Sequence, residues 1–264
     1  MGRIPLLHLR ALSCRSISLS HCNLEWRITF QLFRSVLFSG FRDPSGLIGF
    51  SQWGVDCGGY IRGTNDPTEE LWARWMHFST FSPVYEIMIG TNHTPWYPPY
   101  TSRLVSILKE TTNLHNSLIP YIKSYTYQAT QTGVPVIRAL LLEYPQDPKV
   151  YTTTDTYAVG EGFLVAPILN AGGTRSVYFP TGTSYLEYFN KTDVYQGGTT
   201  HSILLEWESV PVYVREGAII PTGTCTKGIR SGRNGSPTWR FESSQAIAAQ
   251  NPSSSIIMRL RTSR

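Results

Sequence analysis

We predict that the chain folds as an α/β part followed by an antiparallel β-sandwich, with the change near Gly133. Before Gly133, apolar residues recur at helical spacing in two stretches, and each stretch follows a short strand-like segment. After Gly133, short apolar runs are separated by clusters of Gly, Pro, Asn and Asp, which is typical of an antiparallel sandwich. The 264 residues are 41% hydrophobic, which provides enough apolar material for one large core or two modest ones.

The first element is a short apolar strand that leads into a glycine-rich segment. Three apolar residues form the predicted strand, namely Leu47, Ile48 and Phe50. Beyond it, Asp56 stands between Trp53 and the pair Gly58 and Gly59, which allow a sharp turn and a close approach of the backbone to a ligand. This pattern predicts that Asp56 faces a pocket. The alternative is that Asp56 caps the next turn and Trp53 fills the core.

Two helices and a second strand follow in the α/β part. Residues 66–69, Asp-Pro-Thr-Glu, predict a helix start with Pro67 in the first turn and acidic side chains at the positive end of the helix dipole. Four apolar residues form the predicted buried face of this helix, namely Leu71, Trp72, Trp75 and Phe78. Residues 83–89 predict a strand, and residues 102–131 predict a long helix that bends at Pro120, because proline has no amide hydrogen.

The β part is predicted from six apolar runs bounded by turn residues. These runs cover residues 134–142, 163–168, 176–179, 185–188, 202–207 and 212–215. Their spacing alone fits many β-domains, lectins included, so it predicts a sandwich without predicting a function.

The segment 53–60, Trp-Gly-Val-Asp-Cys-Gly-Gly-Tyr, resembles the Trp-Gly-x-Asp-Ile-Gly-Gly-Phe block of glycoside hydrolase family 31, with departures at Cys57 and Tyr60. This is the α-glucosidase and α-xylosidase family. Four more blocks are similar to the family in the same order, namely residues 69–76 with 81–83, 90–96, 160–169 and 210–221. The resemblance implies the last two units of a (β/α)8 barrel followed by the family's C-terminal β-domain.

The resemblance divides the chain into four predicted parts. Residues 1–33 do not continue the family pattern and are a non-homologous or mispredicted N-terminal segment. Residues 34–133 are the C-terminal part of the glycosidase barrel, and residues 134–221 are the β-sandwich domain. Residues 222–264 are rich in Ser, Arg and Gly without a strand or helix period, which predicts a basic, disordered tail.

The resemblance also implies a sugar-binding site at the carboxyl ends of the barrel strands, where β/α barrels carry their ligand-contacting residues. Asp56 would accept hydrogen bonds from sugar hydroxyls, His93 would donate one, and Trp53 would present an apolar wall. Arg74 is a further candidate for substrate contact, with a supporting salt bridge as the alternative. Two roles stay open for Glu86, namely substrate binding and pairing with Arg74.

The catalytic groups of the family have no match in this sequence. The resemblance implies retaining enzymes in which a nucleophile and an acid/base, both Asp, precede the Asp56 block, and hydrolysis needs both carboxylates. The acid/base position falls near Arg27, in Glu-Trp-Arg-Ile, while Asp43 lies too close to Asp56 and suits a turn. We therefore assign no catalytic residue and expect a truncated, inactive chain.

We expect neither a cofactor nor a metal ion. No two histidines lie at metal-ligand spacing with an acid, and the four cysteines lack C-x-x-C spacing. No run of about eighteen apolar residues predicts a membrane span. The net charge of +5 arises at the two ends, because residues 34–221 hold twelve basic and sixteen acidic residues, so we expect no nucleic-acid partner.

Two functional hypotheses follow. The first is a family 31 glycosidase acting on an α-linked oligosaccharide or glycoside, with this chain providing the floor of the substrate site. The alternative is a non-catalytic carbohydrate-binding or interaction protein. Two β/α units expose unpaired strand edges, so we also expect self-association through those edges. His8 and Arg10 interrupt the apolar residues of the N-terminus, which makes a poor secretion signal and leaves the localisation open.

Overall fold

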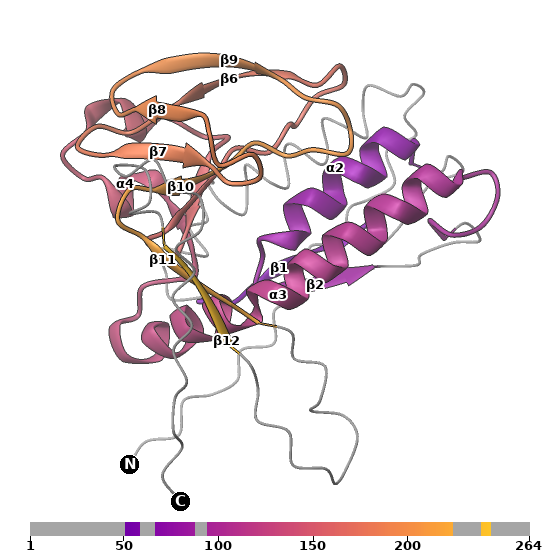
Figure 1. The fold of residues 1–264 in the computed structure, drawn as a ribbon, viewed down its shortest axis with the longest axis horizontal. Coiled ribbons are helices and arrows are strands. Elements are labelled where there is room, and N and C mark those ends of the chain that lie inside the picture. Colours follow the sequence, from indigo (N-terminus) through magenta and orange to yellow (C-terminus); the bar gives the residue numbers. More distant parts are fainter. Residues whose placement is uncertain (1–50, 59–66, 88–93, 224–238, 244–264) are drawn as a thin grey trace, which may run out of the picture.

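The computed structural model describes residues 51–58, 67–87, 94–223 and 239–243. In its α/β part, strand β1 (Gly54–Cys57) pairs in parallel with strand β2 (Val84–Ile87). Helix α2 (Glu69–Thr80) connects the two strands, and helix α3 (Ser102–Thr132) follows β2 and lies beside α2 (Figure 1). This order confirms the predicted alternation of strands and helices. The predicted strand at 47–50 lies outside the described residues.

Local capping chemistry fixes the start of α2. The Thr68 hydroxyl accepts a hydrogen bond from the amide of Leu71 at 3.2 Å, and Glu69 and Glu70 occupy the first turn, where acidic side chains favour the helix dipole. Thr68 is therefore the N-cap, and Pro67 precedes the cap instead of occupying the first turn as predicted. The side chain of Thr68 decides this boundary because it satisfies an amide that the helix cannot.

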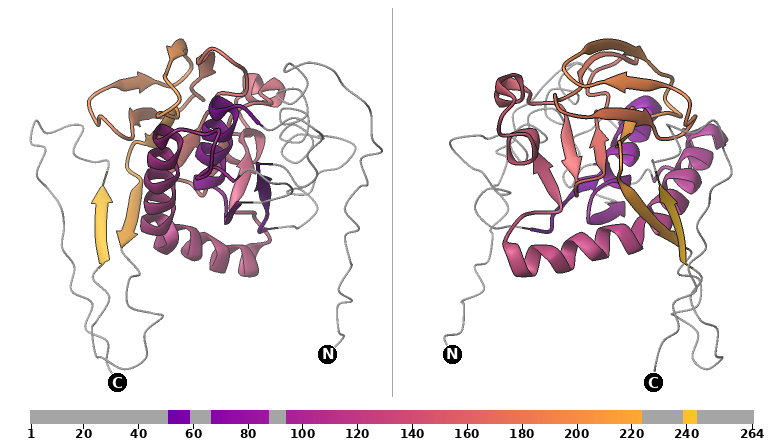
Figure 2. Two further views of the ribbon diagram at one scale, coloured as in Figure 1. Left: turned by 90° about the vertical axis from the view of Figure 1, so that its right-hand side faces the viewer. Right: turned by 60° about the vertical axis from the view of Figure 1, so that its left-hand side comes forward.

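Helix α3 agrees with the predicted long helix and ends at a glycine. Gly133 adopts a left-handed conformation with φ of 75°, and its amide donates to the carbonyl of Ala129 at 2.9 Å. This is the usual C-terminal role of glycine, which carries no Cβ to oppose a positive φ. Figure 2 shows that α3 bends along its length. Pro120 lies inside the helix and lacks the amide hydrogen of a normal turn, which is the predicted cause of the bend.

The β part contains a six-stranded antiparallel sheet and a two-stranded sheet. The order of the larger sheet is β3-β4-β5-β10-β7-β8, and the smaller sheet pairs β6 with β9. The strands are β3 (Ile137–Ala139), β4 (Tyr157–Val159), β5 (Phe163–Val165), β6 (Thr174–Tyr178), β7 (Ser184–Glu187), β8 (Val194–Gln196), β9 (Thr200–Leu204) and β10 (Val212–Arg215). This arrangement confirms the predicted antiparallel sandwich.

The predicted strand boundaries hold best where turn residues flank the strand. β10 covers the predicted residues 212–215, whereas the predicted strand 134–142 becomes the short β3 and helix α4 (Leu140–Glu143). A short apolar run does not distinguish a strand from a buried helical turn, which explains this difference. β4, β8 and the 3-10 helix η1 (Pro148–Thr152) have too few residues for a periodic pattern.

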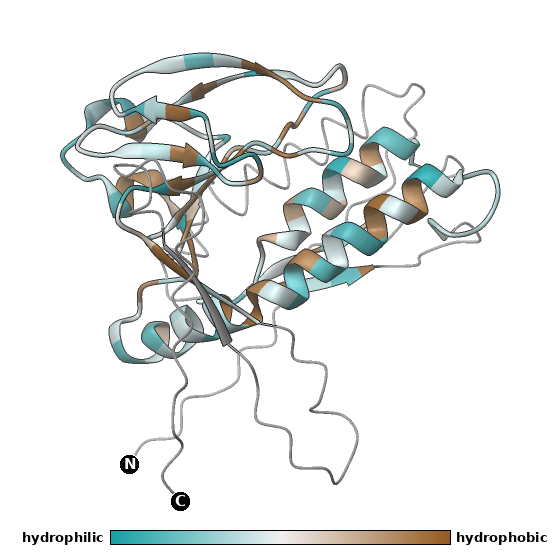
Figure 3. Ribbon diagram, in the orientation of Figure 1, coloured by the Kyte–Doolittle hydropathy of each residue, from teal (hydrophilic) through white to brown (hydrophobic). Residues whose placement is uncertain are grey.

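The larger sheet buries side chains on both faces. Val212 and Val214 of β10 belong to a core cluster with the helical residues Leu118 and Tyr121, while Tyr213 between them belongs to the cluster shared with β6. Alternate residues of a strand point to opposite faces, so the helices cover one face and the small sheet covers the other. Figure 3 shows hydrophobic residues along both helices and the strands.

A tyrosine joins α3 to the turn between two strands. The Tyr121 hydroxyl donates to the carbonyl of Val159 at 2.7 Å and accepts from the amide of Gly162 at 2.9 Å. A Cβ at Gly162 would lie 2.8 Å from that hydroxyl, so the glycine is required for the contact. The second half of α3 is therefore fixed to the sheet by polar contacts as well as by apolar packing.

One strand corrects the prediction of a disordered tail. β11 (Ile219–Gly223) lies against α3 and pairs in an antiparallel manner with β12 (Trp239–Ser243), which belongs to the residues assigned to the tail. The ladder with β11 supplies the hydrogen-bond partners that composition does not reveal. The other residues from 224 onward lie outside the described residues.

A loop of the β part, residues 205–209, docks onto both helices. Arg74 of α2 donates to the carbonyls of Leu205, Glu206 and Ser209 at 2.9, 2.9 and 3.1 Å. The Nε2 atom of His77 lies 2.7 Å from the carbonyl oxygen of Trp207. A carbonyl only accepts hydrogen bonds, so Nε2 carries the proton of the neutral ring.

Arg103 of α3 completes the contact with this loop. It forms an ion pair with Glu208, in which Nη2 lies 2.8 Å from Oε2, and its guanidinium lies 3.8 Å from the centroid of the Trp207 ring. The two helices are thus attached to the same five-residue loop. The contact between the α/β part and the β part consequently relies on backbone carbonyls and a bidentate pair as well as on apolar burial.

We predict that His77 makes the folded chain sensitive to acid. Burial, opposed by the Trp207 hydrogen bond and aided by the charge of Arg74, lowers the pKa of His77 from 6.5 to about 4. Between pH 6.5 and about pH 4, His77 is protonated in the unfolded chain but not in the folded chain, so stability falls as the pH drops. This one group accounts for a loss of about 2 kcal/mol between pH 7 and pH 5.

Urea unfolding at the two pH values tests this prediction. His77→Gln keeps a donor for the Trp207 carbonyl and does not titrate. The variant should therefore lose less stability than the unmodified chain on acidification. An equal loss in both proteins would contradict the role of His77.

Candidate functional site

Two acidic residues lie opposite each other in the parallel strand pair. The register places Asp56 of β1 opposite Glu86 of β2, each one residue before the end of its strand. Asp56 is half-buried and Glu86 is exposed. Asp56 is thus part of a strand, not of the loop after it as predicted, because its backbone pairs with β2.

The opposite face of the strand pair is packed against the helices. Cys57 is fully buried in a cluster with Trp72 of α2 and Ile107 of α3, and Tyr85 and Ile87 pack against the same cluster. Because side chains alternate along a strand, Asp56 and Glu86 lie on the face away from this cluster. In a β/α barrel, the face away from the helices is the barrel interior.

The two carboxyl groups share a hydrogen bond. This hydrogen bond raises the pKa of Glu86, and burial and the negative charge of Asp56 raise it further. Retaining glycosidases hold their two catalytic carboxyls on opposite sides of the scissile bond. Asp56 and Glu86 instead lie side by side on adjacent strands. The pair therefore suits contact with hydroxyl groups on one side of a ligand.

A glycine immediately after the strand brings α2 against the site. Gly58 has φ of 93°, and a Cβ at this position would lie 2.0 Å from the Cη2 atom of Trp72. The residue thus needs both a positive φ and the absence of a side chain. The positive φ agrees with the predicted turn after Asp56, while Gly59 and Tyr60 lie outside the described residues.

Trp53 is placed in the core contact between β1 and α2. Its half-buried ring lies 6.2 Å from the ring of Phe78, and it packs against the core cluster of the larger sheet. The indole N–H is buried and has no hydrogen-bond partner among the described residues. This position matches the core-filling alternative for Trp53.

Arg74, a further predicted substrate contact, binds the 205–209 loop instead of the acid pair. The Arg74 guanidinium is 5% exposed, binds the three carbonyls of the 205–209 loop and lies 3.5 Å from Glu70. This is the supporting role named as its alternative. Glu86 accordingly pairs with Asp56, not with Arg74. His93 lies outside the described residues.

The described residues contain neither a candidate metal site nor a membrane-spanning helix. Across 51–58, 67–87, 94–223 and 239–243, no three His, Cys, Asp or Glu residues are grouped so as to hold a metal ion. No helix in the same ranges is long and apolar enough to cross a membrane.

Family comparisons match both parts of the chain. The description "Glycosyl hydrolases family 31 TIM-barrel domain" matches residues 44–126, and "Glycosyl hydrolase family 31 C-terminal domain" matches residues 133–220. A 1,6-alpha-glucosyltransferase of Sporosarcina globispora is 34% identical over 209 residues, which cover 75% of this chain and 16% of that protein. Alpha-glucosidase 2 of Bacillus thermoamyloliquefaciens is 34% identical over 182 residues, covering 67% and 22%. The chain thus spans about a fifth of the length of these relatives.

Solved structures agree with this result. A Flavobacterium johnsoniae GH31 dextranase complexed with glucose matches with a TM-score of 0.66 and 30% identity, over 74% of this chain and 24% of that one. A GH31 alpha-xylosidase from a soil metagenome complexed with xylose matches with a TM-score of 0.60 and 29% identity, over 66% and 29%. These matches confirm the barrel end followed by a C-terminal β-domain.

We predict that Asp56→Asn lowers the pKa of Glu86. The asparagine amide donates a hydrogen bond to the Glu86 carboxylate and carries no charge, so both changes favour the ionised form. A carbon-detected NMR titration of the Glu86 carboxyl measures this shift. In the unmodified chain, the stability that the shared proton provides is present at acid pH and is lost as the pH rises through the Glu86 pKa. An unchanged midpoint in the variant would show that the carboxyls do not interact.

We predict that Gly58→Ala destabilises the chain by about 2 to 5 kcal/mol, since alanine resists a positive φ and its methyl group overlaps Trp72. Gly133→Ala is the matched control, because Gly133 also has a positive φ but nothing within 4 Å of the added Cβ. The control should lose only about 1 to 2 kcal/mol. Urea unfolding compares the two variants, and equal losses would exclude a steric role for Trp72.

Proposed function

Because the chain belongs to glycosyl hydrolase family 31, we propose that it forms part of an α-glycosidase that hydrolyses the O-glycosyl bonds of α-glucosides or α-xylosides. Its contribution to that enzyme is a pair of sugar-binding carboxyls, Asp56 and Glu86. The observation that carries the proposal is their juxtaposition at the carboxyl ends of two parallel strands, on the face away from the helices. Ligand-contacting residues of β/α barrels lie at these strand ends.

The chemistry of the pair suits a sugar with several hydroxyl groups. The carboxyl oxygens of Asp56 and Glu86 accept hydrogen bonds from hydroxyl donors, and their positions side by side suit two neighbouring hydroxyls of one sugar ring. Hydrogen bonds to charged groups contribute about 1.5–3 kcal/mol each, more than bonds between neutral groups. The dextranase and xylosidase structures contain glucose and xylose respectively, which supports a neutral pyranose as the ligand class.

We propose further that this chain binds the sugar without cleaving it. Cleavage needs two carboxyls on opposite sides of the scissile bond, whereas Asp56 and Glu86 are neighbours on adjacent strands. The curated relatives are several times longer than the matched segment, and the groups that cleave the bond are proposed to lie in parts of those proteins that this chain does not match.

A combined activity and binding assay tests the proposal. The purified chain should not turn over 4-nitrophenyl α-glucoside or 4-nitrophenyl α-xyloside, but it should bind isomaltose or xylose. Asp56→Asn should weaken sugar binding at the strand ends at least about tenfold, which corresponds to about 1.4 kcal/mol. Glu161→Gln, which alters an acid that is 54% exposed in the turn between β4 and β5, is the control and should bind normally.

The outcomes separate the two claims. Turnover at ordinary enzymatic rates by the purified chain would contradict the assignment of a binding role without cleavage. Sugar binding that is identical in the Asp56→Asn variant at every site would contradict the role of Asp56.

A further inference from the structure

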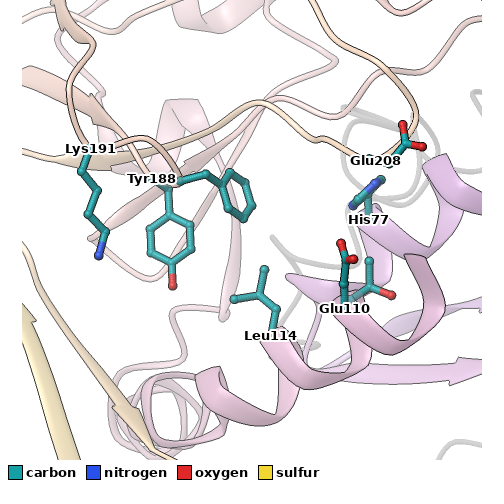
Figure 4. A pocket seen from close by; sticks show the side chains of 8 residues that line it. His77, Glu110, Leu114, Tyr188, Lys191 and Glu208 are labelled. Carbon is teal, nitrogen blue, oxygen red and sulfur yellow. The ribbon is translucent and has the colours of Figure 1, made fainter. Parts of the chain in front are cut away.

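A cavity of 330 Å³ lies between the helices and the β part, away from Asp56. Its walls come from α2, α3, the 205–209 loop and the turn after β7, and they meet because the β part docks onto the helices. Its lining includes His77, Glu110 and Leu114 on the helices and Tyr188, Phe189 and Glu208 in the β part. Figure 4 shows Tyr188 and Lys191 on one side of this space and His77, Glu110 and Glu208 on the other.

Two of the walls are held in place by contacts outside the cavity. Glu208 is bound by Arg103, whose guanidinium also covers the Trp207 ring. His77 is fixed by its hydrogen bond to the Trp207 carbonyl. The cavity is therefore formed by side chains with defined positions, and its size is at the lower end of the range of about 300–1,000 Å³ for small-molecule sites.

The apolar wall is mainly aromatic. Tyr188 and Phe189 lie with their ring centroids 5.1 Å apart in an edge-to-face arrangement, and Leu114 faces the same cavity from α3. Phe189 is 49% exposed, which is high for a phenylalanine in a turn. An aromatic ring exposed at the edge of a cavity can cover an apolar face of a ligand.

The polar groups of the cavity mostly accept hydrogen bonds. Nε2 of His77 donates to Trp207, which leaves Nδ1 as the acceptor of the neutral ring. The Glu110 carboxylate also lines the cavity, whereas both oxygens of Glu208 are already bound to Arg103. The Thr111 hydroxyl already donates to the carbonyl of Ile107 at 2.7 Å. Glu110 and Nδ1 of His77 therefore offer acceptors to the hydroxyl groups of a ligand.

We propose that this cavity is a second saccharide-binding site, which takes a neutral pyranose of monosaccharide size. The C–H face of the ring lies against Phe189, and its hydroxyls donate to Glu110 and His77. The charge of Glu208 is compensated by Arg103, and Glu110 and Lys191 carry opposite charges, so a neutral ligand fits the cavity best. This inference does not depend on sugar binding by Asp56.

The test uses the full chain with Asp56→Asn, so that binding at the strand ends is weakened. Methyl α-glucoside is titrated up to its solubility limit, and the NMR signals of the His77 ring are followed. We expect a saturable shift. Adding Phe189→Ala or Glu110→Gln should raise the apparent Kd at least about fivefold, a loss of about 1 kcal/mol that matches a lost aromatic contact or hydrogen bond.

Tyr127→Ala is the matched control, because Tyr127 is a 69% exposed aromatic on α3 that does not line the cavity. It should leave the Kd unchanged. The proposal would be overturned if no His77 signal shifts, or if the Phe189→Ala and Glu110→Gln variants keep the Kd of the Asp56→Asn parent. Stronger binding of putrescine or inorganic phosphate than of the sugar would also overturn it, because the site would then select charge.

Discussion

The contact between Arg74 and the carbonyls of the 205–209 loop is the interaction on which the rest of the structure depends. A guanidinium that is 5% exposed requires partners for its N–H groups, and the loop supplies three of them. The same helix carries Trp72, whose ring packs against Gly58 directly after Asp56. The position of the β part is thus linked through α2 to the strand end that carries the acid pair.

The larger sheet packs against the helices on one face and against the β6–β9 sheet on the other. Its residues alternate between the helix face and the small-sheet face, so neither face is exposed to water over most of the strands. The cavity lies at the edge of this arrangement, where the turn after β7 and the 205–209 loop meet α3. Acid pair and cavity therefore lie in different layers, and each is formed by its own set of contacts.

The sequence was informative where local chemistry decides the structure. Proline, glycine and capping residues placed α3 to within one residue at its C-terminal end, and turn residues defined β10. Contacts between distant segments were harder to predict. The register that places Asp56 opposite Glu86 depends on pairing across the chain, and the partners of Arg74 lie more than a hundred residues away. No local pattern in β12 marks its pairing with β11.

The hydroxyl of Tyr121 limits where the chain can be divided into independent parts. Helix α3 begins beside α2 and, beyond Pro120, holds the β4–β5 turn through two hydrogen bonds of this phenol. Cutting the chain at Gly133, where the two family descriptions adjoin, would expose apolar surface on both pieces and leave the carbonyl of Val159 without its donor. The second half of α3 therefore belongs structurally to the β-domain, and an exchange of this domain between relatives would have to carry that half-helix with it.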